Sequence, residues 1–293
     1  MTGALAAFRS GGDRWGTAAA LSTLAGQELL RGDLAAARRS ATEGHRMFSE
    51  LGDRWGQLRT AYPLAALAAI VGDYPRATAL HEEGLRLAEE LGFWPEAADR
   101  LSGLGRVALL TGDAAGADGL HRRARALAAE HGYPAGEVHA EIGLALGARR
   151  RGEFDRAEEL LRRTLDWHRG ADFGPGPALL LAESGFLAEQ RGDAAGALAL
   201  HRQGLAVARR GGDPRAVALA QEGLAGAHAA AGRPLRAARL LGAAARARAA
   251  GAPLPVGERA DTDRITARVR AALGPEAFAA AFAGTGRPDP STA

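Results

Sequence analysis

The stretch Gly72-Asp73-Tyr74-Pro75-Arg76-Ala77 decides the fold, because close copies of it recur along the chain. Glycine can take the left-handed conformation that ends a helix, and an aspartate directly after it can cap the next helix. Proline fits in the first turn of that next helix, since its missing N–H is not needed there. The stretch therefore predicts a tight turn between two helices.

The glycine of this turn belongs to a series with a constant spacing of 40 residues. An alanine keeps the same spacing without exception, and a second glycine series, broken only by Asp172, runs between the members of the first. The three series are Gly32, Gly72, Gly112, Gly152, Gly192 and Gly232; Ala37, Ala77, Ala117, Ala157, Ala197 and Ala237; and Gly12, Gly52, Gly92, Gly132 and Gly212. Apolar residues between the glycines recur every three or four positions, which is helical periodicity. The sequence thus predicts six hairpins, each with a helix A and a helix B.

Composition limits the chemistry available to the chain. Of 293 residues, 47 % are hydrophobic and only 5 % aromatic, so the core must consist mainly of alanine and leucine. The absence of cysteine excludes disulfides, thiolate zinc sites, iron–sulfur clusters and thiol catalysis. All 37 basic residues are arginine, and the formal net charge is +3. No apolar run approaches the roughly 20 residues of a membrane span, and no signal peptide begins the chain, so we expect a cytoplasmic protein without membrane contact.

The repeats resemble the tetratricopeptide repeat, which has small residues in both helices and a Gly-Asp-Tyr type of turn. Residues 72–77 match that turn closely, and residues 152–157 match it with Glu153 in place of aspartate. The period here is 40 rather than 34 residues, and the aromatic residue that the family has in helix B is replaced by Ala41, His81, His121, Leu161, His201 and Leu241. The resemblance, over residues 12 to about 250, implies an all-α, right-handed solenoid of about six helix hairpins with a C-terminal helical cap.

A narrower resemblance is to the C-terminal sensor region of large bacterial ATPase-linked transcription regulators, of the antibiotic-regulatory and large LuxR types. It is carried by Leu51-Gly52-Asp53-Arg54-Trp55-Gly56, by the related residues 12–16, and by the segment from Gly251-Ala252-Pro253-Leu254-Pro255 to Phe278. No GxxxxGK[ST] phosphate loop is present. The resemblance implies a non-catalytic module that binds a protein, a peptide or a small effector and works with an ATPase and DNA-binding regulator; whether the chain is a fragment or stands alone, and whether it forms homo-oligomers, stays open.

The domain boundaries follow the repeat. We expect residues 1–11 to be the remnant of a preceding helix, residues 12–251 to form the array, residues 252–283 to form the capping helices and residues 284–293 to be a disordered tail. The cap is expected because a terminal solenoid unit needs one polar face, and the tail because it is rich in proline, glycine and threonine.

In the tetratricopeptide family, helix A lines the concave inner wall, and its inward positions lie about 18, 15, 11 and 8 residues before the repeating alanine. Carried over by this resemblance, the positions select a candidate binding surface: Arg59, Tyr62, Asp99, Ser102, Arg106, His139, Arg149, Phe186, Glu189 and Glu222. Arginine offers this surface a planar fork for a carboxylate or a phosphate.

Three other functions are weighed against this one. An enzyme would need a closed groove with His139, Arg106 and Glu189 or Glu222 as acid–base groups, but no catalytic motif supports it. A metal could be held by His81 and His121, but a third ligand is missing; we expect no metal or other cofactor and regard His81, His121 and His201 as packing residues. Direct nucleic-acid binding is not expected, because acidic residues interleave with the arginines and few aromatics are available for stacking.

Overall fold

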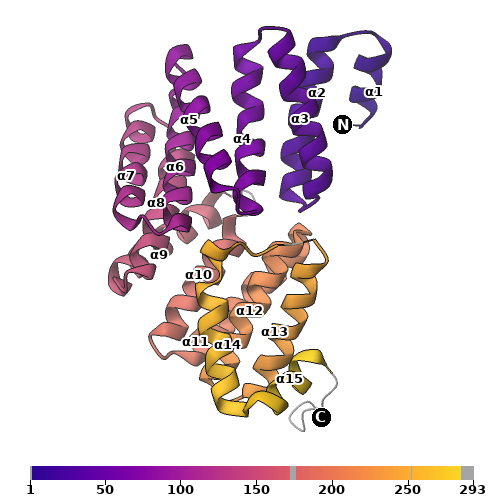
Figure 1. Ribbon diagram of the computed structural model, residues 1–293. Helices are drawn as coiled ribbons and strands as arrows, with labels where there is room; N and C mark the ends of the chain where they lie inside the picture. Colours follow the sequence, from indigo (N-terminus) through magenta and orange to yellow (C-terminus); the bar gives the residue numbers. More distant parts are fainter. Residues whose placement is uncertain (1, 172–175, 252, 285–293) are drawn as a thin grey trace. The chain divides into compact units, whose positions relative to one another are not determined.

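The computed structural model describes residues 2–171, 176–251 and 253–284. Within these residues the chain contains fifteen α-helices, one short 3₁₀-helix and no strand (Figure 1), which confirms the all-α tetratricopeptide-like prediction. The chain divides into two compact units, unit 1 (residues 1–147) and unit 2 (residues 148–293). Asp172 and most of the expected tail, residues 285–293, lie outside the described residues.

The helices follow the predicted order. Unit 1 contains α1 (Thr2–Ser10), α2 (Arg14–Leu30), α3 (Leu34–Glu50), α4 (Arg54–Ile70), α5 (Tyr74–Leu91), α6 (Trp94–Thr111), α7 (Ala114–Glu130) and most of α8 (Pro134–Arg150). Unit 2 contains the end of α8, then α9 (Phe154–Ala171), α10 (Gly176–Gln190), α11 (Ala194–Gly211), α12 (Pro214–Ala230), α13 (Pro234–Ala249), η1 (Val256–Glu258), α14 (Ala260–Leu273) and α15 (Pro275–Ala283). Helices α2/α3, α4/α5 and α6/α7 in unit 1, and α10/α11 and α12/α13 in unit 2, pack as hairpins.

The turns form as the Gly-Asp pattern predicts. Gly72 has a φ of +83°, and the N–H of Asp73 donates to the carbonyl of Ala68 at 2.9 Å, which closes the end of α4. The Oδ1 atom of Asp73 then accepts a hydrogen bond from the N–H of Arg76 at 3.2 Å and caps α5. Each described glycine of both series has a positive φ, which a side chain would strain.

Small residues set the spacing between the helices. The six repeating alanines are fully buried. In three repeats a histidine of helix B, instead of an aromatic residue, packs closely against a glycine of the next helix A. A Cβ added to Gly143 would lie 2.1 Å from His121, and one added to Gly223 would lie 2.1 Å from His201. His81 lies in the same way against Gly103. The three imidazoles therefore fill holes that glycines on the following A helix leave open.

These histidines are buried as neutral rings. Both ring nitrogens of His121 and of His201 lack a hydrogen-bond partner among the described residues, as does Nδ1 of His81. Burial, the largest cause, lowers the pKa of His81 and of His201 to about 3 and that of His121 to about 4. Within the described part of the chain no group of three or more His, Asp or Glu residues could hold a metal ion.

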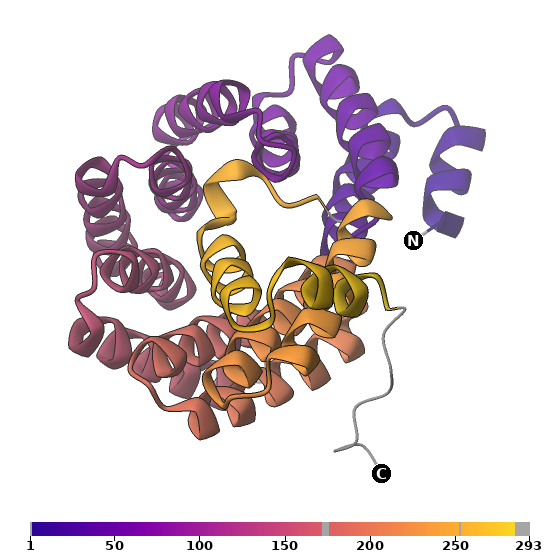
Figure 2. The same cartoon turned by 60° about the horizontal axis from the view of Figure 1, so that its bottom comes forward.

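The C-terminal helices pack against the last hairpin. Figures 1 and 2 show α14 and α15, in yellow, beside α12 and α13. Ile265, Val269 and Phe278 are buried in a common core with Leu241 of α13 and Phe186 of α10. Helix α14 therefore reaches beyond the last hairpin to the A helix of the one before it.

Candidate functional site

In unit 1, the candidate residues lie on successive A helices. Arg59 and Tyr62 are on α4, Asp99, Ser102 and Arg106 on α6, and His139 on α8. We call this set, together with Arg100 described below, the unit-1 face.

Asp99 connects two of the A helices of the unit-1 face. Its Oδ1 lies 3.2 Å from Nδ1 of His139, and its Oδ2 accepts a hydrogen bond from the hydroxyl of Tyr133 at 3.2 Å. Burial and the neighbouring Asp99 carboxylate raise the pKa of Tyr133, so its hydroxyl remains a donor. The histidine and the carboxylate are partly open to solvent, so both can contact a ligand.

Arg100 is the central cation of the unit-1 face, and the sequence reasoning missed it. The residue is 5 % exposed, and its guanidinium carbon lies 4.5 Å from the centroid of the Tyr62 ring. Its Nε and Nη1 find no hydrogen-bond partner in the part of the chain that the structure describes. Its side chain passes over Gly84, where a Cβ would come within 2.9 Å of Cδ. Burial, the largest cause, lowers the pKa of Arg100, and the nearby charges of Asp99 and Glu96 act in the opposite direction without reversing the shift.

Tyr62 lies beside Arg100 on the unit-1 face. The residue is 39 % exposed, and its ring packs edge-to-face with that of the buried His81 at 6.4 Å between centroids. Burial raises the pKa of Tyr62, and the nearby Arg100 acts in the opposite direction. Tyr62 therefore presents a neutral phenol and an aromatic edge beside a buried cation.

The remaining residues of the unit-1 face are placed less centrally. Ser102 is buried, and its hydroxyl lacks a partner among the described residues. Arg106 is half-buried near His121, whose pKa it helps to lower. Arg59 is exposed and lies over the ring of Trp55 at 5.4 Å, without a recorded contact to the other candidates.

In unit 2, Arg149 lies at the centre of a buried cluster of charges. Its Nε donates to Glu183 at 2.7 Å, and its Nη2 donates to Asp261 of α14 at 2.8 Å. Its guanidinium also lies 5.4 Å from the centroid of the Phe186 ring. Burial acts to lower the pKa of Arg149, but the charges of Glu183 and Asp261 outweigh it and raise that pKa.

The other candidates of unit 2 are engaged in a similar way. Glu189 accepts two hydrogen bonds from Arg264 of α14, at 2.7 and 2.9 Å. Glu222 accepts two from Arg248 of α13, at 3.0 and 2.8 Å. Phe186 is buried in the core that α14 helps to form. Arg149, Phe186 and Glu189 therefore contact the protein's own helix α14. Glu222 instead pairs with α13.

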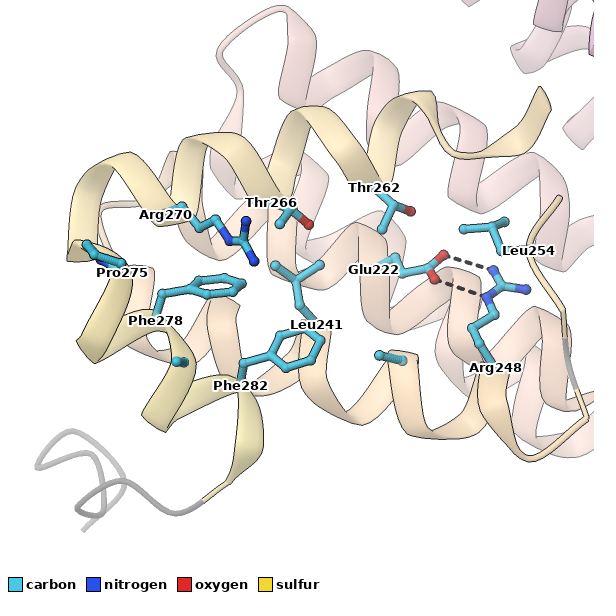
Figure 3. A pocket seen from close by; sticks show the side chains of 12 residues that line it. Glu222, Leu241, Arg248, Leu254, Thr262, Thr266, Arg270, Pro275, Phe278 and Phe282 are labelled. Carbon is cyan, nitrogen blue, oxygen red and sulfur yellow. Dashed lines mark hydrogen bonds and ion pairs between the residues drawn. The ribbon is translucent and has the colours of Figure 1, made fainter. Parts of the chain in front are cut away.

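A pocket that the sequence reasoning did not find lies in unit 2, with a volume of about 720 Å³ (Figure 3). Its walls come from α12, α13, α14 and α15. Its lining residues are Glu222, Leu241, Ala245, Arg248, Leu254, Thr262, Thr266, Arg270, Pro275, Phe278, Ala279 and Phe282. One signal was present in the sequence: Thr262, Thr266 and Arg270 are four residues apart, so a helix places them on one face.

Comparison with known proteins defines the class of fold. The sequence matches no known family model and no curated protein. A Rap conjugation gene regulator of the plasmid pLS20, solved in complex with the Phr* peptide, is 14 % identical with a TM-score of 0.62, over 89 % of this chain and 77 % of that one. Aspartyl phosphate phosphatase F from Bacillus subtilis is 11 % identical with a TM-score of 0.55, over 90 % of this chain and 71 % of that one.

A third structure belongs to a larger protein. A signal transduction ATPase with numerous domains from Pyrococcus horikoshii, which has a tetratricopeptide repeat sensor, is 15 % identical with a TM-score of 0.50. The match covers 80 % of this chain and 36 % of that one. At such identities the three likenesses establish the fold alone, a tetratricopeptide-like helical solenoid. In the described residues no helix is both long and apolar enough to cross a bilayer.

Proposed function

We propose that this chain is a non-catalytic sensor module whose unit-1 face binds a short peptide through the peptide's terminal carboxylate. Arg100 is the observation that carries the proposal. A buried guanidinium whose Nε and Nη1 make no hydrogen bond is unfavourable, and an incoming carboxylate supplies the missing hydrogen-bond acceptor. The planar fork of arginine suits a carboxylate because two parallel hydrogen bonds can form.

The neighbours of Arg100 suit the rest of a peptide. Tyr62 offers an exposed aromatic edge for an apolar side chain, and the partly open Asp99 and His139 offer polar partners for backbone groups. Arg59 and Arg106 are further cations on the same A helices. A rigid helical scaffold that displays such groups can bind an extended ligand without a large conformational cost.

The wider role rests on resemblance. A few stretches of the sequence, such as residues 51–56, resemble the sensor regions of bacterial ATPase-linked transcription regulators. The fold is similar to those of a Rap regulator solved with a peptide and of an ATPase with a tetratricopeptide sensor. We place the chain in the same class, as the part of a bacterial transcription regulator that responds to a peptide and works with an ATPase and DNA-binding partner.

The enzyme alternative is less well supported. One structural neighbour is named as a phosphatase, and the fold by itself excludes no activity. The acid–base groups considered for this chain include Glu189 and Glu222, and each of these carboxylates already accepts two hydrogen bonds from an arginine. We therefore favour the binding function.

The proposal is tested with fluorescein-labelled random heptapeptide pools that differ only at the C-terminus. One pool carries the free carboxylate and the other the amide, and binding to the full chain is followed by fluorescence anisotropy. We expect the amide pool to bind at least about tenfold more weakly, since a charge-assisted hydrogen bond contributes about 1.5–3 kcal/mol. Equal binding of the two pools, or no binding of either, would overturn the proposal.

Two variants locate the site. Arg100→Met should reduce peptide binding to the level of the amide pool, while the thermal midpoint stays the same or rises because an unpaired buried charge is removed. Arg86→Met is the matched control, since Arg86 is exposed on α5. Alanine at Arg59 or Arg106 should weaken binding by about 1.5–3 kcal/mol where these residues make charged hydrogen bonds. Undiminished binding by Arg100→Met would show that the ligand lies elsewhere.

A further inference from the structure

The pocket of unit 2 has the size of a small-molecule site. Its volume of about 720 Å³ lies within the range of roughly 300–1,000 Å³ that is usual for ligand pockets. It is separate from the unit-1 face, because all of its lining residues belong to unit 2. The pocket has one polar side and one apolar side, and together these indicate which ligand it would bind.

One side is a row of polar groups on α14. Thr262, Thr266 and Arg270 point into the pocket in Figure 3. Neither threonine hydroxyl returns to the carbonyl four residues earlier, as those of Thr60 and Thr164 do. The other residues of the helix that face the protein are already used: Asp261 and Arg264 form ion pairs, and Ile265 and Val269, which lie beside the polar row, are buried. The polar row is thus the face of α14 that the fold leaves available.

Arg270 gives the pocket its charge. Its guanidinium carbon lies 4.8 Å from the centroid of the Phe278 ring, and no carboxylate of the described residues forms an ion pair with it. The other arginine of the lining, Arg248, is neutralised by the two hydrogen bonds that it donates to Glu222. The pocket therefore carries one uncompensated positive charge, which calls for a ligand with a single negative charge.

The other side is apolar. Leu241, Phe278 and Phe282 face the cavity in Figure 3, and Ala245, Leu254 and Ala279 complete this part of the lining. Burying the body of an apolar ligand here contributes about 25 cal/mol for each Å² removed from water. A strongly polar ligand of the same charge, such as inorganic phosphate, would leave this surface without a partner.

We propose that the pocket binds one molecule of an apolar monocarboxylic acid. The acid lays its hydrocarbon body against Leu241, Phe278 and Phe282, and its carboxylate accepts hydrogen bonds from Arg270. The hydroxyl of Thr266, one turn away on the same face of α14, is positioned to donate to the second carboxylate oxygen. The single cation favours a ligand with one acidic group, and the apolar side of the pocket favours a ligand with a hydrocarbon body.

The test uses octanoic, decanoic and dodecanoic acid, each with the matched alcohol and amine, and measures binding to the full chain by isothermal titration calorimetry. We expect at least one acid to bind with one-to-one stoichiometry. Its alcohol should bind at least about tenfold more weakly, because the charged hydrogen bonds are lost, and its amine should not bind. Absence of binding by all three acids, or equal affinity of acid and alcohol, would overturn the proposal.

Variants of the lining place the ligand. Arg270→Gln should weaken binding of the acid at least about tenfold and leave binding of the alcohol unchanged. Arg202→Gln, a change at an exposed residue of α11, should alter the affinity for neither compound. Ala245→Trp fills the pocket and should abolish binding while the helical circular dichroism stays the same. Acid binding that persists in Arg270→Gln and Ala245→Trp would contradict the assignment. Arg100→Met should not affect the acid, so failure of this proposal is distinguishable from failure of the peptide site.

Discussion

The Nδ1 atom of His139 lies 3.2 Å from Oδ1 of Asp99, although one full repeat of 40 residues separates the two. The two residues occupy the same position in successive repeats, so residues one period apart in the sequence are in contact across neighbouring A helices. The same Asp99 carboxylate accepts the hydroxyl of Tyr133 and contributes to the raised pKa of that phenol.

Replacing Asp99 with asparagine should lower the pKa of Tyr133 toward its ordinary value, because the negative charge beside the phenol is removed. The change can be followed by NMR of ¹³C-labelled tyrosine during a pH titration. The stability should change by less than about 1 kcal/mol, since the contact between Asp99 and His139 is partly exposed. Glu82→Gln, an exposed change on α5, is the control. A Tyr133 pKa that stays where it is would show that burial alone sets it.

The protein should lose stability as the pH falls below about 6.5. His81, His121 and His201 are neutral in the folded chain, with pKa values of about 3, 4 and 3, but take up protons near pH 6.5 when unfolded. The unfolded chain therefore binds more protons between pH 6.5 and 4, and the free energy of unfolding falls there by up to about 1.4 kcal/mol per pH unit for each histidine.

Urea unfolding at pH 7.5 and pH 5.0 measures this loss. His121→Gln should reduce the difference between the two values by about a third, since one of three similar histidines is removed. His131→Gln, at an exposed ring on the surface, should leave it unchanged. Equal stability of the parent chain at the two pH values would refute the neutral burial of the three rings.

Gly143→Ala should destabilise the chain by about 1–3 kcal/mol, because the new Cβ would lie 2.1 Å from His121. Gly119→Ala is the matched control on α7, where a Cβ meets no atom within 4 Å. That substitution should stabilise by up to about 1 kcal/mol through helix propensity alone. Denaturant unfolding measures the free energy of unfolding of both variants. If the two substitutions changed it in the same direction, the packing of His121 against Gly143 would be contradicted.

Arg149→Met should reduce stability by about 3–5 kcal/mol, because it leaves Glu183 and Asp261 as buried charges without their partner. It should also increase amide hydrogen exchange in α14, which Asp261 helps to hold. Arg202→Met, exposed on α11, should do neither. Unchanged exchange in α14 would mean that the apolar core with Ile265 and Val269 holds the helix by itself.

Much of the fold could be predicted because its signals are local. Gly72 and Asp73 specify a turn through their own backbone and side-chain chemistry, and the period of 40 repeats that turn. The histidine packing was also present in the sequence, since a glycine stands 22 positions after each of His81, His121 and His201. Leu161, by contrast, has Glu183 at that distance.

The sites were harder to predict because they depend on contacts that no period encodes. Arg149 and Glu189 were selected as inner-wall residues, but only the structure shows Asp261 and Arg264 of α14 against them. Arg100 was missed because the inward positions taken from the tetratricopeptide family fall on its neighbours Asp99 and Ser102. The pocket was missed because eight of its twelve lining residues lie beyond the last repeat.

The placement of α14 has a consequence for any molecule that would use the A-helix residues of unit 2. Only residues 250–259 separate the end of α13 from the start of α14, so the helix is a tethered occupant of that surface. Tethers of this length give effective concentrations on the order of millimolar. A free partner must therefore outcompete an intramolecular rival that already satisfies Arg149 and Glu189, and its apparent affinity is reduced by the stability of that closed state.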